Sequence, residues 1–469
     1  MVTETLPTTR SISEDAITAV AASLRGNLTQ AGEAGYDEAR AVYNAMIDKY
    51  PALIVRCRDV ADVIAGVNFA RDQGLLLSIR GGGHNGAGLG TVDDGLVLDL
   101  GLMHGVRVDP LSRTARVEGG ALLSDLHHAT APFGLAMPSG IVASTGVGGI
   151  TLGGGIGHLT RQLGLSIDNL LEADVVLADG SFVVASETEH PDLFWALRGG
   201  GGNFGVVTSF LFKLHPISTL YAGPMLWPLE RAAEVLRWYR EFIVNAPETL
   251  NGFFAFLTVP PALPFPEHLW NQKVCGIVWS CTLPQEQAEV TFAPIRARFG
   301  QPALDGVGPI SHQALQSMFD ALYPAGEQWY WKSDFVNEIL DAAVDLHVQY
   351  AEQLPTWKST MHLYPIDGVA GRVPRDATAW NYRDAHWGMV IIGVSPDPAD
   401  SDRMTAWARE YWSALHPYSV GGAYVNMMME EGQDRVRASY GDHYDQLARI
   451  KAKYDPDNLF QVNQNIKPA

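Results

Sequence analysis

The sequence has few cysteines, few positive charges and no long apolar run. Its three cysteines, Cys57, Cys275 and Cys281, are an odd number in a chain of 469 residues, which argues against a disulfide framework. Lys and Arg number 33 against 52 Asp and Glu, a net charge of −19, so nucleic acid and membrane surfaces are not expected partners. Neither a run of about 18 apolar residues nor a leader-like N-terminus occurs, so we expect an untargeted protein of the cytoplasm.

Glycine is the residue in excess, with 47 of 469 positions against a usual ~7%. It gathers in three runs, RGGGHNGAGLG (80–90), TGVGGITLGGGIG (145–157) and GGGGNFG (199–205). Glycines let a bulky or phosphorylated ligand approach the backbone closely, and consecutive amides can bind an anion. The runs therefore predict a site for a large anionic ligand; the alternative is that they are tight turns of a β-rich fold.

Neither the Rossmann motif nor the P-loop motif, G-x-x-x-x-G-K-[ST], accounts for these runs. Gly81, Gly83 and Gly86 satisfy G-x-G-x-x-G, but no helix follows them as the Rossmann motif requires. The second run contains no cation, so a phosphate there would depend on backbone N–H groups, at the start of a helix expected from His158.

Apolar periodicity predicts a mixture of helices and strands, either an α+β or an α/β fold. Residues 51–80 have the pattern strand, helix, strand, with the helix over 59–73, and short strands follow. After Pro216 the glycine clusters become rare, and strands alternate with amphipathic helices. A charged helix is expected over 434–454, and Glu430, Glu431 and Asp434 are interpreted as its solvated start.

In order and spacing these segments resemble the vanillyl-alcohol oxidase superfamily, which has a PCMH-type FAD-binding fold, and within it the bacterial berberine bridge enzyme-like oxidases. The matching segments are PALIVRCRDVADV, RGGGHNGAG, PSGIVASTGVGGITLGGGIGHLTRQLGLSIDNL, DLFWALRGGGGNFGVVTSF and YGDHYDQLARIKAKYDPDNLFQVNQNIKP. The resemblance implies the α+β class and two domains. Residues 1–215, completed by 433–469, would bind FAD, and 216–432 would form a substrate domain of antiparallel sheet covered by helices.

The resemblance also implies how the flavin is held. The His of RGGGH carries FAD covalently in the family, and His84 stands there. Relatives with a second link have a Cys where this chain has Val142, so a single link is expected. Thr145 stands beside the flavin where side-chain size controls access of dioxygen, and its small size favours an oxidase. His158 is either a cap or a neighbour of the pyrophosphate. The other positions that match FAD-lining residues are Arg80, Gly81, Gly82, Gly83, Asn85, Gly86, Ser139, Gly140, Ser144, Gly146, Gly149, Gly154, Gly157, Val207, Tyr424, Asn463 and Asn465.

Catalysis needs a group that takes a proton from the substrate while hydride passes to flavin N5. Some relatives carry Tyr or His at the fourth position of a Y-x-N-x strand, where this chain has Met427, which cannot ionise. His362, on a strand expected over 360–364, is the candidate base, and a structural His is the alternative. Tyr382 and Tyr424 are further candidate catalytic residues.

The implied reaction is a two-electron oxidation of a small organic alcohol or amine, with dioxygen reduced to H₂O₂. The Trp and Tyr content favours a phenolic, polyketide-like or N-heterocyclic substrate over a sugar. Three alternatives stay open: a dehydrogenase with another acceptor, a flavin monooxygenase and, because of Met427, a non-catalytic flavin-binding protein. No metal is expected.

Overall fold

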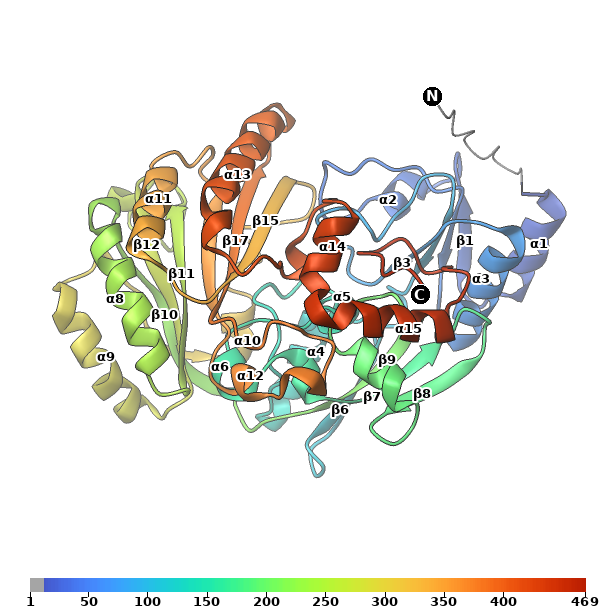
Figure 1. Cartoon of the computed structure of the whole chain (residues 1–469), viewed down its shortest axis with the longest axis horizontal. Helices are drawn as coiled ribbons and strands as arrows, with labels where there is room; N and C mark the ends of the chain where they lie inside the picture. Colours follow the sequence, from blue (N-terminus) through green and yellow to red (C-terminus); the bar gives the residue numbers. More distant parts are fainter. Residues whose placement is uncertain (1–11) are drawn as a thin grey trace.

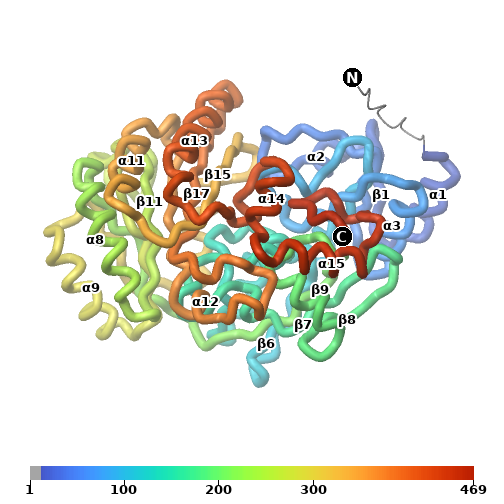
Figure 2. The backbone as a smooth tube through the Cα atoms, viewed as in Figure 1, coloured from blue at the N-terminus to red at the C-terminus, as the bar shows by residue number. Residues whose placement is uncertain are grey.

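The computed structural model describes residues 12–469 and contains three β-sheets (Figure 1). Two sheets lie in residues 12–215, here called the N-terminal part, and the third lies in residues 216–432, the central part. Residues 433–469, the C-terminal segment, cross back over the N-terminal part, as the red end of the tube shows (Figure 2). The first sheet is mixed, because two of its strand pairs are parallel, and the other two sheets are antiparallel; this combination with helices confirms the α+β prediction.

The first sheet is a strand–helix–strand unit extended by two further strands. Helix α3 (Val60–Gln73) begins where the Asp59 carboxylate accepts two backbone N–H groups and ends at Gly74, which has a φ of 65°. The helix predicted over 59–73 is therefore confirmed. The strands, in sheet order, are β1 (Asn27–Gln30), β2 (Leu53–Arg56), β4 (Leu96–Asp99) and β3 (Leu77–Arg80).

The second sheet is antiparallel and contains the second glycine run in one of its connections. Inside that run lies helix α5 (Val147–Leu152), which the glycine content concealed. The helix expected from His158 is only the single turn α6 (Thr160–Leu163). The strands, in sheet order, are β5 (Val106–Asp109), β6 (Thr114–Glu118), β9 (Val206–Lys213), β7 (Leu170–Val176) and β8 (Phe182–Ser186).

The third sheet has eight antiparallel strands, and helices α8 (Ala232–Asn245), α9 (Gln285–Phe299), α11 (Asp341–Ala351) and α13 (Ser401–Leu415) cover one of its faces (Figure 1). The strands are β13 (Leu304–Asp305), β10 (Thr219–Pro228), β12 (Lys273–Cys281), β11 (Leu250–Thr258), β16 (Thr360–Pro365), β17 (Trp387–Ser395) and β15 (Gln328–Val336), with β14 (Gly308–Ser311) paired to β10.

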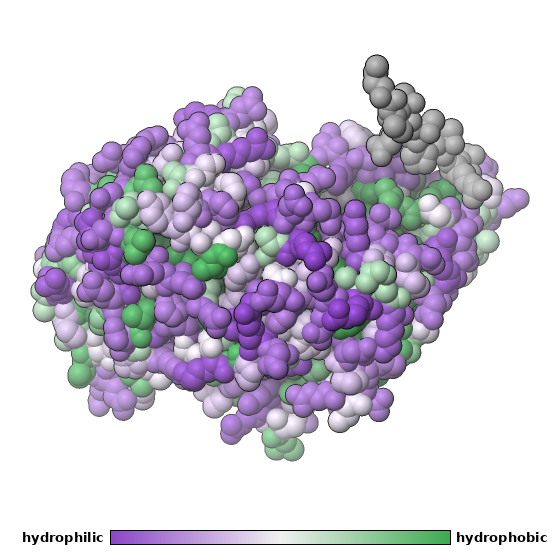
Figure 3. All heavy atoms as spheres, in the orientation of Figure 1, coloured by the Kyte–Doolittle hydropathy of each residue, from purple (hydrophilic) through white to green (hydrophobic). Residues whose placement is uncertain are grey.

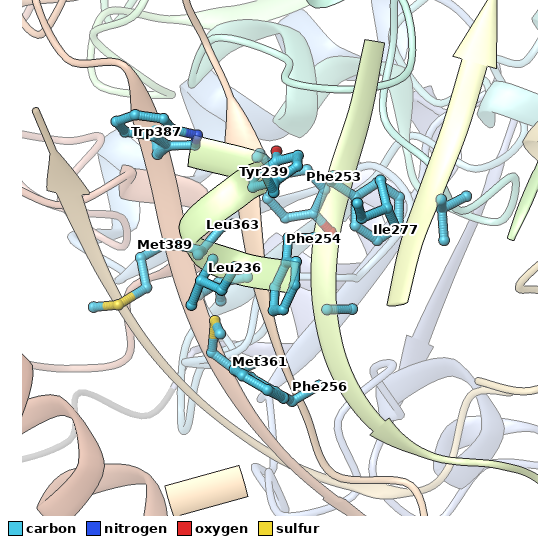
Figure 4. Close-up of a cluster of buried hydrophobic side chains, with 14 of the residues drawn as sticks. Leu236, Tyr239, Phe253, Phe254, Phe256, Ile277, Met361, Leu363, Trp387 and Met389 are labelled. Carbon is cyan, nitrogen blue, oxygen red and sulfur yellow. The ribbon is translucent and has the colours of Figure 1, made fainter. Parts of the chain in front are cut away.

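Strand β16 shows how this sheet divides its side chains between two faces. Met361 and Leu363 lie among the buried side chains with Leu236 and Tyr239 of α8 (Figure 4). Because successive strand residues point to opposite faces, His362 and Tyr364 point the other way, toward the N-terminal part. The sequence expectation of a strand over 360–364 is confirmed.

The C-terminal segment forms two helices where one was expected. Helices α14 (Gln433–Tyr440) and α15 (Tyr444–Tyr454) are separated at Gly441, which has a φ of 53°. Lys451 of α15 is fully buried, pairs with Asp455 and donates to the carbonyl of Asn203 in the third glycine run. A buried cation thus ties this segment to a glycine loop of the N-terminal part.

The visible surface is mostly hydrophilic, with apolar side chains scattered over it (Figure 3). All three cysteines are buried and unpaired. Across residues 12–469, helices long and apolar enough to cross a membrane are lacking.

Candidate active site

A cavity of about 340 Å³ lies between the glycine-rich loops of the N-terminal part and the uncovered face of the eight-stranded sheet. All three glycine runs reach it, and so do strands β15, β16 and β17. One end is therefore mostly backbone and the other end is mostly aromatic side chains.

The first two glycine runs pack backbone against backbone. A Cβ atom on Gly82 would lie 2.3 Å from the backbone nitrogen of Gly146, so neither position has room for a side chain. In the described chain, the backbone N–H groups of residues 82–86 donate to no protein acceptor. Consecutive unpaired N–H groups beside a cavity form a site for an anion.

His84 is held on two sides at the wall of this cavity. Its Nε2 lies 3.0 Å from Oγ of Ser144, and the Tyr43 ring stacks on the imidazole at a centroid distance of 3.9 Å. Desolvation lowers the pKa of His84 to about 4. The ring is therefore neutral at pH 7, and when Nε2–H donates to Ser144 the lone pair of Nδ1 is free.

Most residues expected to line FAD lie at the cavity wall: Arg80, Gly81, Gly82, Gly83, His84, Asn85, Gly140, Val142, Thr145, Gly146, Gly149, Val207, Tyr424 and Asn463. Arg80 is not a free cation there, because its guanidinium pairs with Asp99 at 3.0 Å. This ion pair joins the start of the first glycine run to strand β4.

The remaining expected residues lie behind the wall: Gly86, Ser139, Ser144, Gly154, Gly157, His158 and Asn465. The Ser144 hydroxyl contacts His84, which does line the cavity. His158 is buried, and its backbone carbonyl accepts hydrogen bonds from Asn251 and Ser280 of the central part. His158 is therefore not the cap of α6, whose N-cap is Leu159, and it is not part of the cavity wall.

Sequence reasoning missed several contributors to the glycine-lined end, among them the residues of the third run and Tyr43. The third run was part of the predicted ligand site, but its residues Gly201, Gly202 and Asn203, which line the cavity, were not among the positions expected to line FAD. Tyr43 also lines the cavity, and no motif surrounds it in the sequence.

The lining fits the FAD that the resemblance implies. The Cβ positions of Gly149 and Gly202 face open space, so a ligand can lie directly on both backbones. Oδ1 of Asn463 is buried and lacks a partner within the described residues, which leaves an acceptor for a ligand donor. Together with the unpaired N–H groups of residues 82–86, these features suit a long ligand with an anionic centre and polar ring edges.

The opposite end of the cavity is uncharged. Its wall consists of side chains from β15, β16 and β17, the loop before β15 and the turn that holds Met427. In the part of the chain that the structure describes, Arg80 is the one Asp, Glu, Lys or Arg that lines any part of the cavity. The lining residues at this end include Phe319, Tyr323, Trp329, Trp331, Ser333, Thr360, His362, Tyr364, Gly388, Val390, Ile392, Tyr424, Asn426 and Met427.

His362 and Tyr364 form a hydrogen-bonded pair on this wall. Nδ1 of His362 lies 2.7 Å from the Tyr364 hydroxyl, and the Phe253 ring lies about equally close to both rings, at 5.0 and 4.9 Å. Desolvation lowers the pKa of His362 to about 3. Desolvation also raises the pKa of Tyr364, with smaller contributions from Tyr323 and Tyr424.

The Tyr424 hydroxyl oxygen has two hydrogen-bond donors beside it. The oxygen accepts the backbone N–H of Gly155 and lies within hydrogen-bonding distance of Nδ2 of Asn426, both at 2.9 Å. Tyr424 is the residue before a 3₁₀ turn, η8 (Val425–Met427), so the Y-x-N-x segment is not the strand that was expected. With both lone pairs used, Tyr424 is a hydrogen-bond donor to whatever fills the cavity.

Tyr382 lies outside the cavity, and this corrects its assignment to the catalytic residues. Its hydroxyl donates to the carbonyl of Ala438, and its ring stacks on Phe335. The geometry therefore gives Tyr382 a packing role between the central part and α14. Thr145 does line the cavity, beside the first glycine run.

The chain matches known families over both of its ends. The family described as "FAD binding domain" matches residues 51–186, and "Berberine and berberine like" matches residues 423–467.

An FAD-linked oxidoreductase of Dictyostelium discoideum is 32% identical over 91% of either chain. The structure of 6-hydroxy-D-nicotine oxidase from Arthrobacter nicotinovorans matches with a TM-score of 0.84 at 27% identity, over 95% of this chain and 99% of its own. A xylooligosaccharide oxidase from Myceliophthora thermophila in complex with xylobiose matches with a TM-score of 0.84 at 25% identity, over 97% and 99%. The chain therefore belongs to the berberine bridge enzyme-like family of FAD-linked oxidoreductases, and the resemblance found in its sequence is confirmed.

Proposed function

We propose that this protein is a cytoplasmic oxidase of a small, uncharged aromatic alcohol or amine, with FAD linked to His84 alone. The N-terminal part and the C-terminal segment together would hold the cofactor, and the central part would select the substrate. FAD supplies a hydride acceptor when bound, and dioxygen takes up the two electrons as H₂O₂.

The surroundings of His84 support the single link. The imidazole is neutral and fixed by Ser144 and Tyr43, which is the state in which a ring nitrogen is a nucleophile. Val142 lines the same cavity but has no nucleophilic atom. The cysteines are buried elsewhere, so a second attachment point has no candidate among them.

The absence of charged side chains at the aromatic end of the cavity is the observation that carries the substrate class. Burying an ionised substrate there without a partner would cost several kcal/mol, about the cost of an unpaired charge in a protein interior. Phenol and imidazole groups from Tyr323, Tyr364, Tyr424 and His362 instead offer neutral hydrogen bonds among aromatic walls. A small planar molecule with one or two oxygen or nitrogen atoms matches this wall better than a sugar.

His362 is the group on this wall where the substrate proton can finally reside, since Met427 leaves the other family position without an ionisable group. Thr145 is small and lines the cavity, which supports dioxygen as the acceptor.

A panel of three alcohols tests this proposal. Under anaerobic conditions, 4-hydroxybenzyl alcohol is expected to bleach the flavin absorbance faster than xylobiose. The matched anion 4-(hydroxymethyl)benzoate should be at least ~100-fold less effective, because its carboxylate would be buried unpaired. Efficient bleaching by the anion or by xylobiose alone would contradict the substrate class.

Reoxidation and denaturation test the other two parts of the proposal. Air should restore the flavin colour with release of H₂O₂; slow reoxidation in air and fast reoxidation by an artificial acceptor would make the protein a dehydrogenase. Acid-precipitated protein should stay yellow, and the peptide containing His84 should carry the mass of FAD less two hydrogens. A colourless pellet would overturn the covalent link without touching the family assignment.

A further inference from the structure

We propose that Tyr364, and not His362, receives the proton of the substrate, and that Tyr364 passes its own proton to Nδ1 of His362. This relay rests on the proposed oxidation and names the path of its proton. Tyr364 would then touch the substrate, and His362 would act behind it as the final acceptor.

The direction of the hydrogen bond between the two side chains supports this order. A phenol O–H is far more acidic than the N–H of a neutral imidazole, so at 2.7 Å the Tyr364 hydroxyl donates and Nδ1 of His362 accepts. The imidazole hydrogen then sits on Nε2. In this tautomer Nε2 has no lone pair, so His362 cannot take a substrate proton directly from the cavity.

The Tyr364 oxygen is open to the cavity in a way that suits an acceptor. In residues 12–469 its hydroxyl makes no hydrogen bond other than that to His362, so its lone pairs are unused. The residue opposite it on β17 is Gly388, which lines the cavity and places no side chain over the phenol. A substrate O–H or N–H can therefore donate to Tyr364 while the hydride-bearing carbon faces the glycine-lined end.

The step balances as follows for an alcohol. The substrate O–H bond breaks and an O–H bond forms at Tyr364; the former Tyr364 O–H bond breaks and an N–H bond forms at Nδ1 of His362. The C–H electron pair leaves the substrate as hydride for the FAD of the proposed reaction, so the carbinol becomes a carbonyl and the cofactor takes two electrons.

The groups around His362 and Tyr364 do not stabilise a protonated His362, so the relay is transient. The titratable groups facing it are the phenols of Tyr323 and Tyr424, and no carboxylate lines the cavity to stabilise an imidazolium in the described chain. Burial disfavours a charged His362 in the resting protein. Proton transfer is therefore expected only as hydride leaves, when the substrate proton becomes strongly acidic.

The chain contains a matched pair outside the cavity. Nδ1 of His347 on α11 lies 2.7 Å from the hydroxyl of Tyr411 on α13, and both side chains are buried on the helix-covered face of the sheet. This pair has the same atoms, the same distance and similar burial, although the Tyr411 hydroxyl also lies 3.4 Å from the backbone carbonyl of His347; without access to substrate, it serves as the control.

Nitrogen NMR of the flavin-loaded protein, labelled with ¹⁵N-histidine, tests the tautomer without any substrate. His362→Asn identifies the His362 signals by their loss. We expect a protonated Nε2 and an unprotonated Nδ1 in the wild type, with the Nδ1 shift moving in Tyr364→Phe and staying fixed in Tyr411→Phe. A hydrogen on Nδ1 of wild-type His362 overturns the relay, whatever the activity.

Flavin reduction by 4-hydroxybenzyl alcohol then tests the order of the two residues. Tyr364→Phe and His362→Asn should each slow reduction at least ~100-fold, the usual contribution of a positioned proton acceptor, and the double variant should be no slower than either. Tyr411→Phe should reduce at the wild-type rate. Near-normal reduction in Tyr364→Phe, with loss in His362→Asn, would make His362 the direct base and overturn the relay. If 4-hydroxybenzyl alcohol fails to reduce the wild type, the substrate class fails, and the NMR result still decides the direction of proton donation.

Discussion

Tyr43 covers one face of the His84 imidazole, with ring centroids 3.9 Å apart and ring planes 20° apart. Its hydroxyl donates to the carbonyl of Tyr323 in the central part, and its backbone N–H donates to the carbonyl of Gly83. Tyr43 therefore joins the loop that carries His84 to the opposite wall of the cavity. The orientation of the imidazole depends on this aromatic stack as well as on Ser144.

Removing the stack should impair flavin attachment. Tyr43→Ala is expected to lower the fraction of covalently bound FAD and to reduce the free energy of unfolding by about 3–5 kcal/mol, as for other buried aromatic truncations. Tyr43→Phe keeps the ring and loses one hydrogen bond worth about 1 kcal/mol, so its attachment should be near normal. Flavin fluorescence of the denatured band on a gel measures the bound fraction. Equal attachment in Tyr43→Ala and Tyr43→Phe would show that stacking does not orient His84.

The pH dependence of attachment should follow the buried histidine. Desolvation lowers the His84 pKa from 6.5 to about 4, so the nucleophilic neutral form persists down to that pH. The initial rate of FAD attachment to apoprotein is therefore expected to be level from pH 8 to about 5 and to fall below that. A rate that halves near pH 6.5 would mean that His84 titrates as an exposed imidazole.

The same shift predicts a loss of stability in acid. Between pH 6.5 and about 4 the unfolded chain binds a proton at His84 and the folded chain does not. As the pH falls through this range, the free energy of unfolding therefore decreases by up to about 1.4 kcal/mol per pH unit. His84→Gln should remove this share of the slope, which urea titrations at several pH values measure. An unchanged slope would contradict the assigned shift.

Gly149 and Gly82 differ in whether an added side chain would occupy the cavity or collide with the protein's own backbone. A methyl group on Gly149 meets no protein atom within 4 Å, whereas one on Gly82 would lie 2.3 Å from the backbone of Gly146. Gly149→Ala should leave the apoprotein as stable as before, or up to about 1 kcal/mol more stable through its helix propensity, yet weaken FAD binding. Gly82→Ala should lower the melting temperature of the apoprotein itself. Thermal unfolding with and without FAD distinguishes the two, and a Gly149→Ala protein that binds FAD normally would place the cofactor away from α5.

The sequence was informative where local chemistry decides the structure. The helix over 59–73 was predictable because Asp59 and Gly74 bound it, and the glycine runs predicted the ligand site because glycine lets a ligand approach the backbone closely. Helix α5 was concealed because glycine disfavours helix, and here tertiary packing of Val147 and Leu152 overrides that propensity.

The aromatic end of the cavity was harder to predict because it is assembled from distant segments. His362 and Tyr364 share a face only if residues 360–365 form a strand, and their neighbour Phe253 comes from β11. Tyr382 was misplaced because its position in the sequence gives no information about which way its ring turns. Glu431 was interpreted as solvated, but it lies before α14 and is buried against Lys332.

That buried pair gives the last prediction, since Glu430 and Glu431 are adjacent glutamates with different environments. Glu431 pairs with Lys332, whose ammonium also lies 4.3 Å from the Trp412 ring centroid, whereas Glu430 is exposed. Glu431→Ala leaves the Lys332 ammonium buried without its carboxylate, so the free energy of unfolding should fall by about 3–5 kcal/mol. Glu430→Ala should change it by less than about 0.5 kcal/mol. Because the pair is shielded from solvent, the difference between the two variants in urea titrations should persist at 1 M salt, and its disappearance there would mean that the contact is a surface one.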